Sequence, residues 1–228
     1  MNKFIFAANF KCNHTRESFG EYARILSQSL NGEKVIIFPP FSAFIKGELG
    51  FVQGAQNFYP VKNGAFTGEI GLDMLDEFDI KTVIIGHSER RQILGESDEI
   101  LRQKFDFAKE QNFTIVYCIG EDLATYESGK TKEFLSSQLK NIDLDYANLI
   151  IAYEPIWAIG SGKTPSMAEI GEILDFIATL SKAPLLYGGS VNAKNIAEIS
   201  RIPNCGGVLV GSASLNAQNF LNLIKETK

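Results

Sequence analysis

The sequence has few of the residues that build disulfide frameworks and metal sites. Its 228 residues include three cysteines, Cys12, Cys118 and Cys205, which form no CxxC pair and are odd in number. A disulfide framework is therefore not expected, and a reducing compartment, the cytoplasm, is the predicted location. The two histidines, His14 and His87, belong to no HExxH motif or Cys/His cluster, so we expect no metal site.

Long hydrophobic runs and an excess of positive charge are also missing. The apolar run at residues 4–8 is too short for a signal sequence or a membrane span, so no membrane association is expected. A net charge of −5 argues against nucleic acid as a partner, but a small anion can still be bound by local donors. Neither a low-complexity tract nor a Pro/Gly linker divides the chain, which predicts a single domain over residues 1–228.

Short β-rich apolar runs recur along the whole chain. Such runs, with little polar alternation, are typical of parallel strands buried on both faces. They lie at residues 4–8, 35–38, 52–55, 83–85, 115–119, 149–152, 185–187 and 208–210. Helical periodicity marks residues 15–30, 97–111 and 166–181, so strands and helices alternate as βαβ units. Eight units in this length predict an α/β fold, a closed (β/α)8 TIM barrel. An open doubly wound sheet is the alternative, although no GxGxxG follows the first run.

Polar residues follow several of these predicted strands, where a barrel of this kind places its active site. Each has an ordinary structural explanation when taken alone, such as a turn, a helix cap or a solvated charge. At one end of one barrel they instead suggest proton abstraction beside a carbonyl group. The residues are Asn9, Lys11, His87, Glu154, Ser190, Gly211 and Ser212.

The expected chemistry divides these residues into two groups. Glu154 would take the proton, His87 would donate to the substrate oxygens, and Lys11 would supply positive charge, with Asn9 as a further donor. Backbone amides in the glycine-rich turns after the seventh and eighth strands would hold a phosphate.

A small, flexible segment at residues 158–162 predicts a lid over this site. Gly160 to Thr164 resembles the end of a P-loop, but Trp157 stands where that motif requires its first glycine. Stiffer residues flank the segment on both sides, and its closure would expel water from the site.

Six strings of residues resemble the triosephosphate isomerase family over nearly the whole chain. They are Asn9-Phe10-Lys11, Gly64-Ala65-Phe66-Thr67-Gly68-Glu69, Gly86-His87-Ser88-Glu89-Arg90-Arg91, Cys118-Ile119-Gly120-Glu121, the run from Ala152 to Gly160, and Tyr187-Gly188-Gly189-Ser190-Val191. The resemblance implies interconversion of dihydroxyacetone phosphate and glyceraldehyde 3-phosphate through an enediolate, in glycolysis and gluconeogenesis, without a cofactor.

The resemblance also implies roles for individual residues. Glu154 matches the base, His87 the electrophile, and Lys11 and Asn9 the substrate-binding pair. Ser88 matches the residue that holds the glutamate while the lid is open, and Glu89 matches the partner of the lysine. Ile159 and Leu209 match an apolar pair that presses on the base. The phosphate-binding amides match Gly160, Ser190, Gly211 and Ser212.

The loop at residues 64–69 matches one that inserts into a second subunit, which implies a homodimer. Phe66 lies in this loop, and Thr67 would support Asn9 and Lys11 of the other copy.

Several positions depart from the family pattern. Ser212 replaces a usual glycine but keeps its backbone amide. Pro165 has no N–H to donate to the Tyr187 hydroxyl, so the hydrogen bond that latches the closed lid should be absent or made elsewhere. Tyr126 replaces a common arginine, and residues 138–149 form a shorter segment than usual.

Two other functional classes fit parts of the sequence. Another phosphate-binding barrel, such as a sugar-phosphate epimerase or an isomerase of aromatic amino-acid biosynthesis, would share the phosphate site but would not need the Trp157 lid. A barrel kept as a binding or surface-adhesion module would be expected to lose Lys11, His87 or Glu154, and all three are present.

Overall fold

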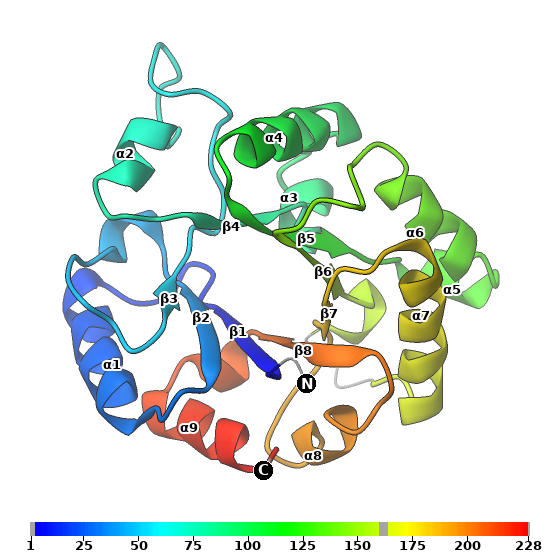
Figure 1. Ribbon diagram of the computed structural model, residues 1–228. Coiled ribbons are helices and arrows are strands. Elements are labelled where there is room, and N and C mark those ends of the chain that lie inside the picture. The colour runs from blue at the N-terminus through cyan, green and yellow to red at the C-terminus, as the bar shows by residue number, and fades with distance from the viewer. Residues whose placement is uncertain (1–2, 160–163, 228) are drawn as a thin grey trace.

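A parallel barrel of eight strands forms the centre of the molecule. The computed structural model describes residues 3–159 and 164–227. The strands are β1 (Ile5–Asn9), β2 (Lys34–Phe38), β3 (Val52–Gln53), β4 (Thr82–Ile85), β5 (Thr114–Ile119), β6 (Leu149–Tyr153), β7 (Leu185–Tyr187) and β8 (Cys205–Val210). They follow the order β3-β2-β1-β8-β7-β6-β5-β4, with the helices outside the ring (Figure 1). The predicted closed barrel is confirmed, and an open doubly wound sheet is not.

The ring closes between β3 and β4, and few backbone pairs form this seam. The N–H of Gly54 donates to Ile37 O of β2 at 2.8 Å, and the N–H of Ala55 donates to Thr82 O at 2.8 Å on the β4 side. Ala55 and Val83 form one isolated parallel bridge. Backbone pairing thus passes from β2 at Gly54 to β4 at Ala55. A Cβ at position 54 would lie 2.4 Å from the Phe38 ring, so this position requires glycine. The predicted strand at residues 52–55 is therefore shorter than expected, because its last two residues pair with different neighbours.

Helices cover the outside of the barrel. They are α1 (Arg16–Ser29), α2 (Leu72–Asp76), α3 (Ser88–Gln92), α4 (Asp98–Glu110), α5 (Leu123–Glu127), α6 (Thr131–Leu139), α7 (Met167–Leu180), α8 (Ile196–Ile199) and α9 (Ala217–Lys225). The helices expected at residues 15–30, 97–111 and 166–181 are α1, α4 and α7, each begun by a side-chain cap. Ser166 and Glu169 form the predicted capping box of α7. No helix in the described part of the chain is both long and apolar enough to cross a membrane.

Alternation of strand and helix fails at one place. Residues 39–51, all of which the structure describes, contain the single 3-10 turn η1 (Phe41–Ala43) between β2 and β3. Phe41 and Phe44 take part in the outer core, so aromatic packing replaces a crossover helix there.

Two apolar cores explain why the strands read as uninterrupted hydrophobic runs. Alternate strand residues fill the inside of the barrel, among them Ile36, Val116 and Ile150. The intervening residues pack outward against the helices in a larger cluster. Val52 of β3 is an exception, because it is 47% exposed beside the seam.

Candidate active site

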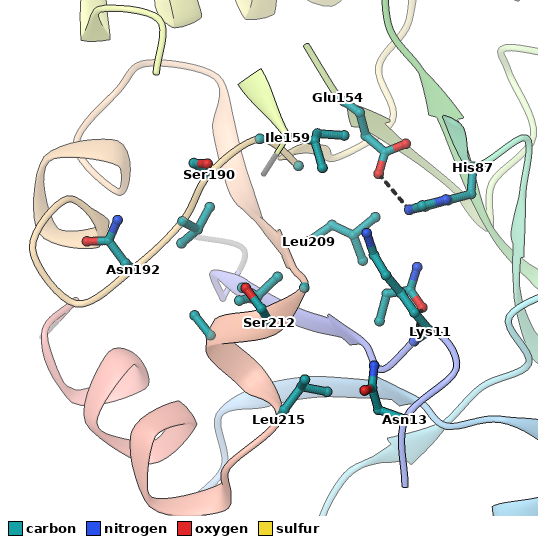
Figure 2. Close-up of a pocket in the computed structure, with 17 residues that line it drawn as sticks. Lys11, Asn13, His87, Glu154, Ile159, Ser190, Asn192, Leu209, Ser212 and Leu215 are labelled. Atoms are coloured by element: carbon teal, nitrogen blue, oxygen red, sulfur yellow. Dashed lines mark hydrogen bonds and ion pairs between the residues drawn. The ribbon is translucent and has the colours of Figure 1, made fainter. Parts of the chain in front are cut away.

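A cavity of about 530 Å³ opens at the carboxyl ends of the strands, where the sequence predicts the active site. Of the predicted site residues, Asn9, Lys11, His87, Glu154, Ile159, Ser190, Leu209, Gly211 and Ser212 line it. Figure 2 shows Glu154, His87 and Lys11 on one side of the cavity and Ser190 on the other. Gly160 lies outside the described residues.

Glu154 follows β6 directly and is 2% exposed. Its Oε1 lies 3.3 Å from His87 Nε2, the contact drawn in Figure 2. Its Oε2 accepts a hydrogen bond from the backbone N–H of Ser88 at 3.3 Å. The contact with Ser88 uses the amide of the serine rather than its hydroxyl.

The hydrogen bonds of His87 fix which ring nitrogen carries a proton. The backbone N–H of Glu89 donates to Nδ1 at 3.3 Å, so Nδ1 is an acceptor. The Glu89 carboxylate is farther away, with Oε2 at 3.7 Å from Nδ1. The proton of a neutral imidazole is therefore on Nε2, the atom that faces Glu154 and the cavity.

Lys11 is held in an unusual backbone conformation. Its φ is +51°, a region that a residue with a side chain seldom occupies. Asn9 Oδ1 accepts from the Lys11 N–H at 3.0 Å, and Gln56 Nε2 donates to Lys11 O at 2.8 Å. The ammonium group bonds to Glu89 Oε1 at 2.6 Å. Local strain maintained by several contacts is common at functional sites, and here Lys11 lies on the side of the cavity where His87 and Glu154 also lie (Figure 2).

The space around the Glu154 side chain is closely limited. A Cβ at position 188 would lie 2.8 Å from Glu154 Cγ, so only glycine fits beside it. On another side is Cys118, whose thiol pKa is raised well above its ordinary value by complete burial and by the Glu154 carboxylate. Cys118 therefore stays protonated, and the Glu154 carboxyl group has a neutral neighbour there.

The opposite wall is made from the turns after β7 and β8. Asn195 Nδ2 donates to Ser190 O at 2.9 Å, and Ser190 Oγ donates to Ala158 O at 3.0 Å, which joins this wall to the lid. Ser212 begins the 3-10 turn η3 (Ser212–Ser214) and has no positive φ, so serine replaces the usual glycine without backbone strain.

A buried carboxyl group lies under the first end of the lid. Glu121 is fully buried after β5, and its Oε1 accepts from Trp157 Nε1 at 2.8 Å and from the Tyr153 hydroxyl at 3.2 Å. Burial raises the pKa of the Glu121 carboxyl, and these two hydrogen bonds oppose that rise. The sequence places Glu121 in a family string but gives no sign that it supports the lid.

The remaining predicted residues lie outside the cavity. Tyr187 is fully buried, and its hydroxyl has no hydrogen-bond partner within residues 3–159 and 164–227. This agrees with the missing N–H at Pro165. Phe66 and Thr67 are exposed on a loop that projects from the barrel between β3 and α2 (Figure 1).

Some lining residues were not anticipated from the sequence. Asn13, Asn192 and Leu215 also line the cavity. Each follows a predicted strand by only a few residues, and that position is the signal by which they could have been found. No group of three or more His, Cys, Asp or Glu side chains suited to a metal ion occurs in the part of the chain that the structure describes.

Comparisons with known proteins agree with this geometry. The model of the triosephosphate isomerase family matches residues 4–227. The chain belongs to the triosephosphate isomerase family. It is 62% identical to the triosephosphate isomerase of Campylobacter curvus over 224 residues, which cover 98% of each chain. The triosephosphate isomerase of Campylobacter jejuni subsp. jejuni is 58% identical over 97% of this chain and 99% of its own. That of Nitratiruptor sp. is 49% identical over 98% of both.

The predicted family, and with it the class of isomerase enzymes, is thereby confirmed. A triose phosphate is the substrate class that this family implies. The alternatives of a different phosphate-binding barrel and of a non-enzymatic module are set aside.

Proposed function

We propose that the chain interconverts dihydroxyacetone phosphate and D-glyceraldehyde 3-phosphate, a reaction of glycolysis and gluconeogenesis. One observation carries the proposal: the Glu154 carboxylate lies 3.3 Å from His87 Nε2, in a cavity that Lys11 also lines. A base, a hydrogen-bond donor and a cation thus face the same space, as proton transfer beside a carbonyl requires.

The reaction proceeds by moving one proton between neighbouring carbons. Glu154 removes a proton from the carbon next to the carbonyl, and the electron pair moves onto the carbonyl oxygen. The His87 Nε2–H and the Lys11 ammonium stabilise the resulting enediolate. Glu154 then returns the proton to the other carbon, while the hydroxyl oxygen gives up its proton and the former carbonyl oxygen gains one through His87 Nε2, so no group or electron leaves the substrate. The Ser88 amide must first release Glu154 Oε2, which links the base to lid closure.

The phosphate group would lie against the opposite wall. The amides of Ser190, Gly211 and Ser212 are the proposed donors, with Gly160 joining them from the lid. Such donors bind a dianion locally, so the net charge of −5 is no obstacle. Ile159 and Leu209 line the same cavity and would exclude water from the base.

A coupled turnover assay with glyceraldehyde 3-phosphate tests this function. In Glu154→Asp the carboxylate is one methylene farther back, and a misplacement of about 1 Å costs roughly a hundredfold in rate. The same change at the exposed Glu17 of α1 is the matched control and should leave turnover unaffected. Absence of turnover in the wild type, or equal turnover in Glu154→Asp, would refute the proposal.

A homodimer is part of the same proposal. The loop that carries Phe66 and Thr67 projects from the barrel (Figure 1), and Phe66 is 41% exposed although it packs on Tyr59 at 4.4 Å. Ile93 is 76% and Leu94 61% exposed after α3. Exposed apolar side chains of this size are suited to contact with a second copy. Shortening residues 64–68 should give monomers with low activity in sedimentation and turnover measurements, and an unchanged dimer with full activity would contradict this.

Two further assignments complete the proposal. We place the protein in the cytoplasm, which its three free thiols support. We also assign residues 1–228 to one domain, supported by the single eight-stranded sheet.

A further inference from the structure

The aromatic residue Tyr126 lies against the first end of the lid. Its ring stacks on the Trp157 indole, with centroids 4.3 Å apart and planes inclined by 29°. Trp157 lies three residues after Glu154, in the 3-10 turn η2 (Ile156–Ala158) that leads into the lid. On the inner side, Trp157 Nε1 donates to the buried Glu121. Trp157 is therefore held between Tyr126 outside and Glu121 inside.

The hydroxyl of Tyr126 reaches the other end of the lid. It donates to Glu169 Oε1 at 2.7 Å. Glu169 Oε2 accepts from both the backbone N–H and the hydroxyl of Ser166, each at 2.7 Å, and Ser166 follows Pro165 directly. Hydrogen bonds from Ser166 and Tyr126 lower the pKa of the Glu169 carboxyl, so it is ionised and accepts both contacts. One side chain thus connects the two ends of the lid.

Core packing does not impose this contact. Tyr126 and Trp157 are both half-buried. Beside them lies a second cavity of about 320 Å³, which Tyr153, Pro165 and Glu169 also line. The indole therefore has free space next to it, and the stack with Tyr126 and the bond to Glu121 limit its movement.

The hydrogen bond expected between the second end of the lid and Tyr187 is absent from the described residues. Pro165 has no N–H, and the buried Tyr187 hydroxyl has no partner in the described residues. We propose that Tyr126 is a positioning residue for the isomerase reaction, which holds the two ends of the lid at a fixed separation through Trp157 and Glu169. The inference rests on the proposed function, because a lid matters only if it closes over a substrate. With both ends fixed, Ile159 keeps its position in the cavity beside Glu154 (Figure 2).

Three variants separate the parts of this contact. Tyr126→Phe keeps the stack and removes the hydroxyl, whose hydrogen bond corresponds to a loss in kcat of about fivefold. Tyr126→Ala also removes the stack, which adds about another fivefold. KM should stay within about twofold, because the phosphate-binding wall is untouched. In Glu169→Gln the Tyr126 hydroxyl has already lost its ionic acceptor. Adding Tyr126→Phe to this variant should therefore lower its kcat by less than about a further twofold.

Tyr146→Phe is the matched control. Its hydroxyl also makes one bond of 2.7 Å, to Phe113 O, away from the lid. It should lose as much stability as Tyr126→Phe but keep the kcat of the wild type. Tyr187→Phe removes a hydroxyl that has no hydrogen-bond partner among residues 3–159 and 164–227, and should likewise keep its kcat.

Fluorescence gives a readout that does not depend on turnover. Trp157 is the single tryptophan of the chain, so its emission reports on the lid hinge alone. Emission should move to longer wavelength and become easier to quench with iodide in Tyr126→Ala, and should not change in Tyr146→Phe. If the wild type shows no turnover, the proposed function fails, while the fluorescence comparison still decides the position of Trp157. The inference is overturned if Tyr126→Ala keeps both kcat and Trp157 emission, or if Tyr187→Phe lowers kcat as much as Tyr126→Phe does.

Discussion

Replacing Gly188 by alanine should displace Glu154, the proposed catalytic base, without altering the chemistry of any group proposed to react. An added Cβ would lie 2.8 Å from Glu154 Cγ and 3.4 Å from Tyr153 O. Carbon atoms in comfortable contact are about 3.5–4.0 Å apart, so Glu154 must move by about 1 Å. Gly188 has no positive φ, and alanine there adds no backbone strain. The effect is therefore a shift of one carboxylate.

That carboxylate cannot move without losing contacts. Glu154 is 2% exposed, and its two oxygens lie 3.3 Å from His87 Nε2 and 3.3 Å from the Ser88 amide. A misplacement of about 1 Å costs roughly a hundredfold in rate, or about 2.7 kcal/mol in the activation barrier. We expect kcat to fall by about this factor, with a much smaller change in KM.

The coupled turnover assay, together with thermal unfolding, measures this prediction. Gly20→Ala in α1 is the matched control, because nothing lies within 4 Å of its Cβ and alanine favours a helix. It should keep full activity and gain up to about 1 kcal/mol in stability. A folded Gly188→Ala variant with kcat within about threefold of the wild type would show that the position of Glu154 is not limiting, and would refute the reasoning.

Two further predictions concern buried groups. Burial raises the pKa of the Glu121 carboxyl above its ordinary value of 4.5. The neutral carboxyl group therefore contributes its full stabilisation below about pH 4.5, and this stabilisation is lost as the pH rises through the pKa that Glu121 has in the folded protein. Relative to Glu121→Gln, the wild type should therefore lose free energy of unfolding from about pH 4.5 upward in urea titrations, and a difference independent of pH would disprove it. Gly54→Ala places a Cβ 2.4 Å from the Phe38 ring and 3.1 Å from Thr82 O. It should lower the free energy of unfolding by about 1–3 kcal/mol in urea, and an unchanged midpoint would contradict the close packing at the seam.

The sequence predicts that the proposed reacting groups lie together, because parallel strands end at the same face. Lys11, His87 and Glu154 each follow a recognisable apolar run, so their convergence follows from the barrel itself. The contacts that support these groups are harder to predict from the sequence. Tyr126 and Glu169 are far apart in the chain, and only the packing of α5 beside α7 brings them together. The shortened β3 also depends on pairing, because Gly54 and Ala55 bond to different strands. Local patterns carry no information about such partners.

The single bridge at the barrel seam has a consequence for assembly. Strand β3 shares two residue pairs with β2, and Ala55, just after β3, forms one bridge towards β4, so this arc has the fewest paired residues in the described sheet. Amide hydrogen exchange should be fastest there, because local opening begins where few bonds must break. The projecting loop starts directly after this arc (Figure 1). A second copy bound to that loop would hold the weakest part of the ring closed, so the melting temperature would rise with protein concentration.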